Sequence, residues 1–188
     1  GVTVYKGLKV LDARPGQWVA IVGVGGLGHL AVQYARAMGY HVAAVDIDKS
    51  RLALAQQLGA ALCINSAEQD PVAMLQRELR GVHGALVTAV SSESFSQALG
   101  MLHKRGTMSM VGLPPGDFAL PIFDVVLNAK TVRGSIVGSR QDLNEALQFA
   151  AEGVVHASTT SHRLDDINRV FDALRHGRVD GRAVLSFT

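Results

Sequence analysis

Cysteine is nearly absent from this sequence, because Cys63 is the single one among 188 residues. A disulfide bond within the chain is therefore excluded, and the composition is typical of a reducing compartment, so we expect a cytoplasmic protein. The sequence also lacks an apolar run of the roughly 20 residues that a membrane helix needs. Its opening stretch, GVTVYKGLKV, has neither the charged nor the apolar segment of a signal peptide. We expect no membrane partner.

An excess of charge of one sign is lacking as well. Lys and Arg together number 18 and Asp and Glu 16, and the basic residues are scattered along the chain. Proteins that bind nucleic acid gather basic side chains into a patch or stripe, so nucleic acid is not an expected partner. Apolar residues make up 48% of the sequence, which is enough to bury a core in a chain of this length.

From Gln17 onward, short apolar runs alternate with helical stretches. The runs WVAIVG, HVAAVD, ALCIN, GALVTAV and TMSMVG are separated by segments such as LGHLAVQYARAM and KSRLALAQQL, whose apolar residues recur at helical spacing. Asp48 or Ser50 can cap the second helix, and Gly39 and Gly59 stand where helices commonly end in a left-handed residue. Apolar strands that alternate with helices predict an α/β fold, a doubly wound parallel sheet of the Rossmann type.

The regular alternation loosens after Val111. A turn, GLPPGDFALP, leads to a helix near DVVLNAK and a strand in TVRGSIVG. The helix DLNEALQFAAEG, a strand near ASTTSHRL, the helix DDINRVFDALRHG and a last strand AVLSF follow. We therefore predict a C-terminal α/β limb with its own helices rather than another regular strand–helix unit.

A glycine-rich turn, Gly23-Val24-Gly25-Gly26-Leu27-Gly28, directly follows the strand WVAIV and opens a helix. Pyrophosphate binding needs a tight turn, an approach free of side chains, close helix–strand packing and free N–H groups at the helix start. The motif alone is equally compatible with an ordinary turn. However, Asp46 ends the next strand, 23 residues after Gly23, near the spacing of the acid that binds the adenine ribose. The combination predicts a dinucleotide site.

Asp46 also bears on which nicotinamide cofactor is bound. Its carboxylate can accept hydrogen bonds from the 2′- and 3′-hydroxyls of NAD, but it would repel the 2′-phosphate of NADP. NAD is therefore favoured. Arg51, a few residues further on, keeps the alternative open, because a nearby arginine can also serve a 2′-phosphate.

Several blocks, in this order, resemble zinc-dependent medium-chain alcohol dehydrogenases, and most closely the bacterial ethanol- or propanol-oxidising branch. They are GVTVYKGLKV, GVGGLGHLAVQYARAMG, VDIDKSRLALAQQLGA, INS, TAVS, VGLPPG, GSIVGSRQDLNEALQFAAEG and GRAVLSF. The resemblance covers essentially the whole chain. It implies an oxidoreductase in which hydride passes from a short primary alcohol to NAD, giving an aldehyde, while zinc polarises the alcohol oxygen.

The resemblance also implies a domain organisation. Residues 1–136 would form the NAD-binding Rossmann domain, and residues 137–188 a limb that belongs to the catalytic domain of the full-length enzyme. That domain, with the zinc ligands and the proton relay, would precede this chain and end with a ligand cysteine two positions ahead of Gly1. The chain alone is then expected to bind NAD but to lack catalytic residues, zinc and activity.

Cys63 matches no ligand position of the family, and the seven histidines show no paired metal-binding spacing. We interpret Cys63 as a buried, small apolar residue and the histidines as mostly surface or helix-end residues. His29, beside the glycine turn, is interpreted as a packing residue.

A set of cofactor-binding residues follows from the resemblance. It comprises Gly23, Gly25, Gly26 and Gly28 at the pyrophosphate; Leu27 and Thr3 beside the nicotinamide ring; Asp46 and Arg51 at the adenosine ribose; Ala89 and Val90 beside the ribose and adenine; the backbones of Val111, Ser135 and Val137 at the carboxamide; Leu113 in the inner substrate pocket; and Arg182 at a phosphate.

The strand near residues 131–137 resembles the one that pairs across the family's dimer, so we expect a homo-oligomer, either a dimer or a tetramer. Two alternatives to the main hypothesis stay open. The chain can be a stand-alone NAD(H)-sensing module, or it can come from a cinnamyl-type or zinc-free member of the same enzyme class. Asp46 argues against the NADP-preferring versions of the latter. The sequence does not identify the alcohol, because most of the pocket would lie in the preceding domain.

Overall fold

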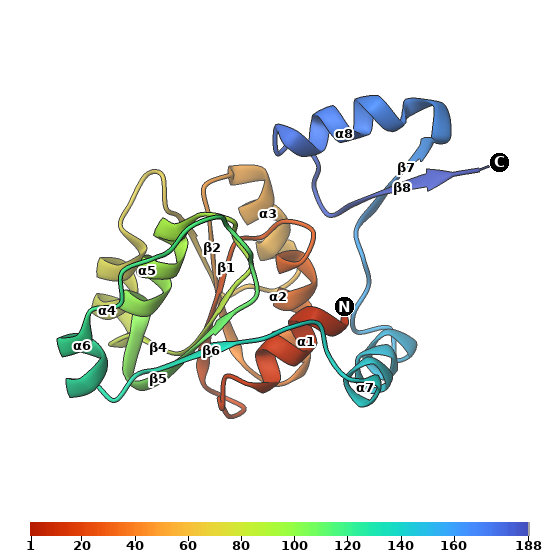
Figure 1. The fold of residues 1–188 in the computed structure, drawn as a ribbon. Coiled ribbons are helices and arrows are strands. Elements are labelled where there is room, and N and C mark those ends of the chain that lie inside the picture. The colour runs from red at the N-terminus through yellow and green to blue at the C-terminus, as the bar shows by residue number, and fades with distance from the viewer. Residues whose placement is uncertain (188) are drawn as a thin grey trace.

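The computed structural model describes residues 1–187 and alternates helices with strands along the chain (Figure 1). In chain order the elements are α1 (Val2–Lys9), β1 (Trp18–Val22), α2 (Gly28–Ala37), β2 (His41–Asp46), α3 (Lys49–Gln57), β3 (Leu62–Asn65), α4 (Pro71–Leu79), β4 (Val82–Val87), α5 (Ser92–Met101), β5 (Leu102–Met110), α6 (Ile122–Leu127), β6 (Thr131–Gly134), α7 (Arg140–Ala151), β7 (Thr159–Arg163), the 3₁₀ helix η1 (Leu164–Asp166), α8 (Ile167–Arg175) and β8 (Arg182–Ser186).

The main sheet has six parallel strands in the order β3-β2-β1-β4-β5-β6. This is the strand order of the doubly wound Rossmann sheet, so the predicted fold class is confirmed. A second, two-stranded parallel sheet pairs β7 with β8. The strand expected near residues 131–137 is shorter than the sequence indicated: β6 begins at Thr131 and ends at Gly134.

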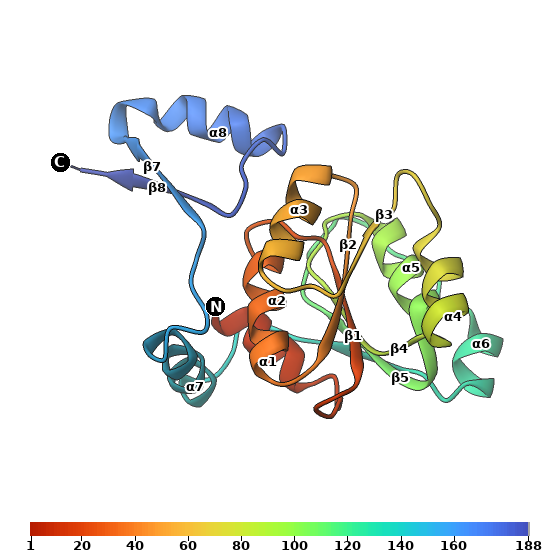
Figure 2. The same cartoon turned by 180° about the vertical axis from the view of Figure 1, so that it is seen from behind.

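Alternate side chains of the central strand point to opposite faces of the sheet. Val19 and Ile21 of β1 join the core beneath α1, α2 and α3, whereas Ala20 and Val22 join the core beneath α4 and α5 (Figure 2). Both faces are thus covered, which explains why the strands are continuous apolar runs rather than alternating ones.

The strand order reverses at β1, with β2 on one side and β4 on the other. The helix that follows β1 covers one face, and the helix that follows β4 covers the opposite face. The carboxyl ends of β1 and β4 therefore diverge at the switch point, where ligands bind in open α/β sheets. The glycine-rich turn between β1 and α2 lies at this point.

Helix α1 was not expected from the sequence. Val4 and Leu8 on this helix are fully buried, and its polar side chains bond to α7. Tyr5 Oη donates to Glu145 at 2.7 Å, and Lys9 Nζ donates to Glu145 at 2.6 Å. Lys9 also donates to Asp142 at 3.0 Å, and Asp142 completes a capping box at the start of α7. These bonds attach the beginning of the C-terminal limb to the core.

This cluster makes the fold sensitive to acid. The hydrogen bond from Lys9, followed by those from Gln141 and Tyr5, lowers the pKa of Glu145 from 4.5 to about 2. A carboxyl group whose pKa is lower in the folded than in the unfolded chain stabilises the fold at any pH above its unfolded-state pKa. That stability is lost as pH falls from 4.5 toward about 2. We expect Glu145→Gln to flatten this part of the dependence of the thermal midpoint on pH, while Glu68→Gln, in an exposed pair with Lys49, leaves it unchanged. Equal pH profiles for wild type and Glu145→Gln would contradict this.

The segment with β7, α8 and β8 projects from the body of the molecule (Figure 1). The start of this segment is bound to α2 through Gln33. The side-chain amide of Gln33 donates to the carbonyl of His156 at 2.8 Å and accepts from the N–H of His156 at 3.0 Å. Several apolar side chains of this segment are exposed, including Leu164, Phe171 and Leu174. Among residues 1–187, no helix is both long and apolar enough to cross a membrane.

Candidate cofactor-binding site

The glycine-rich turn is shaped by steric limits at two of its glycines. Gly23 has φ +91°, and a Cβ atom there would lie 2.8 Å from the amide nitrogen of Ala89 on the β4 side. A Cβ atom on Gly28 would strike the carbonyl oxygen of Gly23. Gly25 differs from both, since no heavy atom lies within 4 Å of the position of its Cβ atom. The turn is therefore packed on its inner side and open at Gly25.

Hydrogen bonds from both neighbouring strands fix the turn. Thr88, which follows β4, donates its hydroxyl to the carbonyl of Gly23 at 2.7 Å. The N–H of Val24 donates to Asp46 Oδ2 at 2.6 Å, at the end of β2. The turn is thus preorganised by contacts with residues on β2 and after β4, and its remaining N–H groups are available at the start of α2.

Asp46 has a second bond on its other oxygen, because Oδ1 accepts from the N–H of Asp48 at 3.0 Å. The residue is only 7% exposed. Each carboxylate oxygen has more than one acceptor position, so both can accept a further hydrogen bond from a ligand. Arg51 Nη1 lies 4.0 Å from Asp46, Nη2 donates to the carbonyl of Gly177 at 2.7 Å, and Nε is buried without a hydrogen-bond partner among the described residues.

A cavity of about 430 Å³ lies over the turn, at the carboxyl ends of β1, β2 and β4. It brings together nine of the residues predicted from the sequence: Gly23, Gly25, Gly26, Leu27, Asp46, Arg51, Ala89, Val90 and Arg182. Arg182 reaches this cavity from β8, and its Nη1 lies 3.2 Å from the position of a Cβ atom on Gly26. The C-terminal limb therefore contributes a cation beside the glycine turn.

A second, mainly apolar cavity of about 720 Å³ contains the other predicted residues except Gly28: Thr3, Val111, Leu113, Ser135 and Val137. Ser91 lines the first cavity and Ser92 the second, so the two adjoin at the start of α5. Ser135 Oγ is buried and has no hydrogen-bond partner among the described residues. Val137 has φ +38°, a strained value for a β-branched residue, and such strain is concentrated at functional sites.

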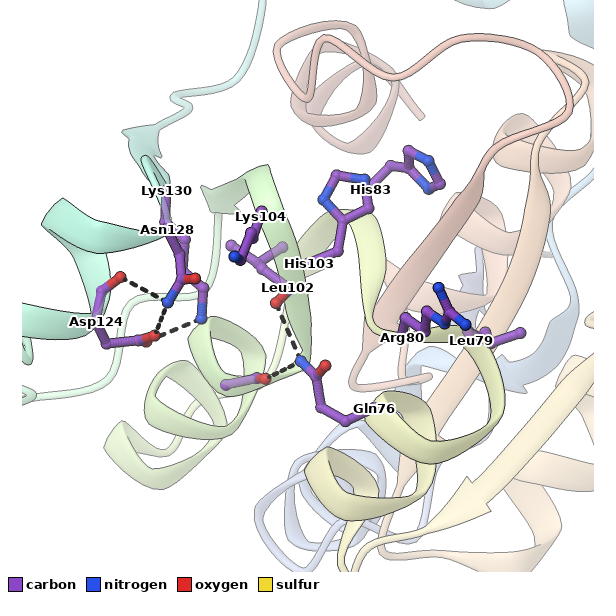
Figure 3. Close-up of a pocket in the computed structure, with 11 residues that line it drawn as sticks. Gln76, Leu79, Arg80, His83, Leu102, His103, Lys104, Asp124, Asn128 and Lys130 are labelled. Atoms are coloured by element: carbon purple, nitrogen blue, oxygen red, sulfur yellow. Dashed lines mark hydrogen bonds and ion pairs between the residues drawn. The ribbon is translucent and has the colours of Figure 1, made fainter.

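A larger cavity, of about 960 Å³, lies at the opposite end of the sheet, and Figure 3 shows the residues that line it. Some of its polar groups bond locally: Lys130 Nζ lies 2.8 Å from Asp124, and Gln76 donates to the carbonyls of Gly100 and Leu102. The Nδ1 atoms of His83 and His103 are buried without a hydrogen-bond partner among the described residues. This cavity adjoins the amino ends of the strands, whereas ligands of this fold bind at the carboxyl ends. We therefore place the candidate site at the cavity over the glycine turn and the apolar cavity that adjoins it.

Sequence reasoning missed two residues that fix this site. Thr88 was not singled out, although a hydroxyl directly after a strand at the switch point is a signal for such a role. His29 was interpreted as a packing residue; it is 0% exposed, and both its ring nitrogens lie at hydrogen-bond distance from backbone groups. The pattern of the sequence gives no signal for those bonds.

Other histidines and Cys63 also differ from expectation. His83 and His103 are half-buried, and their rings lie 4.1 Å apart between centroids. Burial, and then the neighbouring His103, lowers the pKa of His83. Cys63 is only partly buried, and its thiol donates to the carbonyl of Leu52 at 3.5 Å. Among residues 1–187, no group of three or more His, Cys, Asp or Glu side chains is arranged so that it could hold a metal ion.

Comparison with known families agrees with this geometry. The profile described as zinc-binding dehydrogenase matches residues 26–152, from the glycine turn through α7. The chain belongs to the zinc-binding dehydrogenase family. The matched segment begins within the turn, at Gly26, and contains Asp46.

Among the curated relatives, two with 57% identity are named alcohol dehydrogenase. The one from Moraxella sp. is 57% identical over 188 residues, which are 100% of this chain and 56% of the relative. The one from Rhizobium meliloti is 57% identical over 185 residues, 98% of this chain and 54% of the relative. The chain thus spans about half the length of the curated relatives that it matches.

Solved structures of other dehydrogenases and reductases share the fold. The alcohol dehydrogenase from Aeropyrum pernix is 36% identical, with a TM-score of 0.91 over 98% of this chain and 55% of that one. The acetophenone reductase from Geotrichum candidum, solved in complex with NAD, is 26% identical, with a TM-score of 0.86 over 98% of this chain and 52% of that one.

Proposed function

We propose that this chain is the NAD-binding portion of a zinc-dependent alcohol dehydrogenase that transfers hydride from a primary alcohol to NAD and releases an aldehyde. One observation carries the proposal. The carboxylate of Asp46 at the end of β2 is bonded to the glycine turn, and both line one cavity at the switch point of the sheet. A stand-alone NAD-sensing module remains the alternative, but no feature of residues 1–187 specifically favours it over membership of the enzyme family.

The residues present fit NAD. The open position at Gly25 leaves room for a pyrophosphate to approach the backbone, and the N–H groups at the start of α2 offer donors to it. Asp46 would accept hydrogen bonds from the adenosine ribose hydroxyls, and Arg51 lies 4.0 Å from it. A negatively charged carboxylate at that point disfavours a 2′-phosphate and so favours NAD over NADP.

The adjoining apolar cavity is the proposed site for the nicotinamide. Thr3 and Leu27 would lie beside the ring, and the buried, unpartnered Ser135 indicates where polar atoms of a ligand can bind. When bound, NAD supplies the hydride acceptor. This chain's residues would hold and orient that acceptor, and orientation of reactants is worth several kcal/mol of the barrier, on the order of 7 in favourable cases.

The proposal divides the chain into a cofactor-binding domain, residues 1–136, and a limb, residues 137–188, that belongs to the catalytic domain of a longer protein. The exposed apolar side chains of the limb, Phe171 and Leu174 among them, support a covering partner. Zinc ligands would come from outside the described residues. We also propose a homo-oligomer through β6, an edge strand that pairs with β5 alone in the sheet.

An assay separates cofactor binding from turnover. We expect the 188-residue chain to enhance NADH fluorescence on titration and to form no NADH from NAD and ethanol or propanol, with no stoichiometric zinc by elemental analysis. Alcohol-dependent formation of NADH by this chain would contradict the assignment of the catalytic machinery to residues outside it.

Arg182→Ala tests the cation that the limb contributes. Its guanidinium lies beside Gly26, and it forms no ion pair with a carboxylate among the described residues. We expect NADH affinity to fall about tenfold, with a weaker dependence on salt, because a phosphate contact is lost. Arg178→Ala is the control, since that arginine is engaged with Asp172 at 2.7 Å. An affinity equal to that of the control would remove Arg182 from the site.

A further inference from the structure

His29 joins the glycine turn to the C-terminal limb. It lies in the first turn of α2, and Nδ1 is 3.1 Å from the carbonyl oxygen of Gly25. Its Nε2 accepts the backbone N–H of Ser158 at 3.2 Å, across 129 positions of sequence. One ring therefore contacts the turn on one side and the segment before β7 on the other.

These contacts admit a single protonation state of the ring. The N–H of Ser158 is a donor only, so Nε2 has to be unprotonated. Nδ1 then carries the proton and donates to the carbonyl of Gly25. Burial lowers the pKa of His29; the hydrogen bond to Gly25 raises it in part, and Arg182 and His156 lower it further. The imidazole is thus held neutral, with its proton on Nδ1.

The contact continues from Ser158 to β8. The carbonyl of Ser158 accepts the N–H of Arg182 at 2.9 Å. Gly181 has φ +68°, and a Cβ atom there would strike the same carbonyl, so the backbone is closely packed at this point. Ser158 therefore fixes the position of Arg182. The position of Ser158 is in turn fixed by its hydrogen bond to His29 and by the hydrogen bonds between Gln33 and His156.

We propose that His29 is a positioning residue for the cofactor pyrophosphate. Through Ser158 it holds Arg182 beside Gly26, and so it fixes the position of the guanidinium relative to the glycine turn. This rests on the proposed function, because the ligand between the turn and Arg182 is taken to be NAD. It adds a role for a residue that contacts neither the ligand cavity nor the reacting atoms. The neutral ring acts as a rigid spacer with a donor at one end and an acceptor at the other.

Two substitutions separate the two ends of the ring. His29→Gln places a carbonyl oxygen near the position of Nε2 and keeps an acceptor for Ser158, whereas His29→Asn keeps a donor near Nδ1 and loses the link to the limb. We expect His29→Asn to weaken NADH binding about tenfold and His29→Gln to stay within about threefold of wild type. In the Arg182→Ala background, both substitutions should change the affinity less than about twofold, because the cation that they position is gone.

The outcomes distinguish this inference from the proposed function. If wild type binds NADH and Arg182→Ala weakens it, but His29→Asn costs the same with and without Arg182, His29 has no positioning role. If wild type binds no NADH, the proposed function fails instead. Ring ¹⁵N NMR of the unliganded chain gives a readout independent of NAD and of the folding of variants: a proton on Nδ1 supports the inference, and a proton on Nε2 overturns it.

Discussion

Asp46→Asn should lower the preference of the chain for NADH over NADPH by tenfold or more, roughly the effect of removing one charge at contact distance from a 2′-phosphate. NADH binding weakens because a neutral amide accepts more weakly from the ribose hydroxyls than a carboxylate does. NADPH binding weakens less or improves, because the repulsion is removed and Arg51 loses one of its two carboxylate neighbours, Asp46 at 4.0 Å, while Asp180 at 3.9 Å remains. Competitive titrations with both cofactors measure the ratio.

Two features of the structure shape this experiment. Asp46 also accepts from the N–H groups of Val24 and Asp48, so an asparagine, which keeps one acceptor oxygen, is a milder change than glycine. Asp48→Asn is the matched control: it lies two residues away and caps α3, and it does not line the cavity. A ratio that shifts equally in both variants, or in neither, would show that Asp46 does not select the cofactor.

Gly25→Ala should abolish most NADH binding, by about 100-fold, without loss of folding stability. Gly25 has no unusual φ, and its Cβ position is free of protein atoms, so alanine fits the folded chain. Replacing such a glycine reduces the conformational entropy of the unfolded chain and stabilises by roughly 0.4–1 kcal/mol. The added methyl group would, however, occupy the space through which the pyrophosphate approaches the backbone.

Gly28→Ala is the informative contrast. Its methyl group would strike the carbonyl of Gly23, so both the thermal midpoint and the affinity for NADH should fall. The two variants thus separate a glycine needed by the ligand from one needed by the fold. If Gly25→Ala binds NADH as tightly as wild type, the pyrophosphate does not lie against this turn.

Most of the fold could be predicted because its signals are local. The strands are continuous apolar runs, Asp48 caps α3 as expected, and Gly39 and Gly59 have φ of +83° and +97° after their helices. Helix α1 could not be predicted in this way. Its sequence has three β-branched residues at its start and no side-chain cap, and it is held by burial of Val4 and Leu8 and by bonds to α7.

The residues of the candidate site also differ in whether local sequence signals could reveal them. The turn and Asp46 could be found from spacing, since both belong to one strand–helix–strand unit. The link from His29 to the limb could not, because Ser158 lies 129 positions away in the sequence. For Thr88 the only signal is its place directly after a strand, because its partner Gly23 lies 65 positions away. Arg182 was expected only through the family resemblance, since its place beside Gly26 depends on how the limb returns to α2.

Calorimetric titration of the 188-residue chain with NADH and with NADPH tests the central claim most directly. The account predicts that NADH binds at one site per chain and that NADPH binds more weakly, because the Asp46 carboxylate faces the adenosine ribose over a turn open at Gly25. Tighter binding of NADPH, or no heat of binding with either nucleotide, would contradict it.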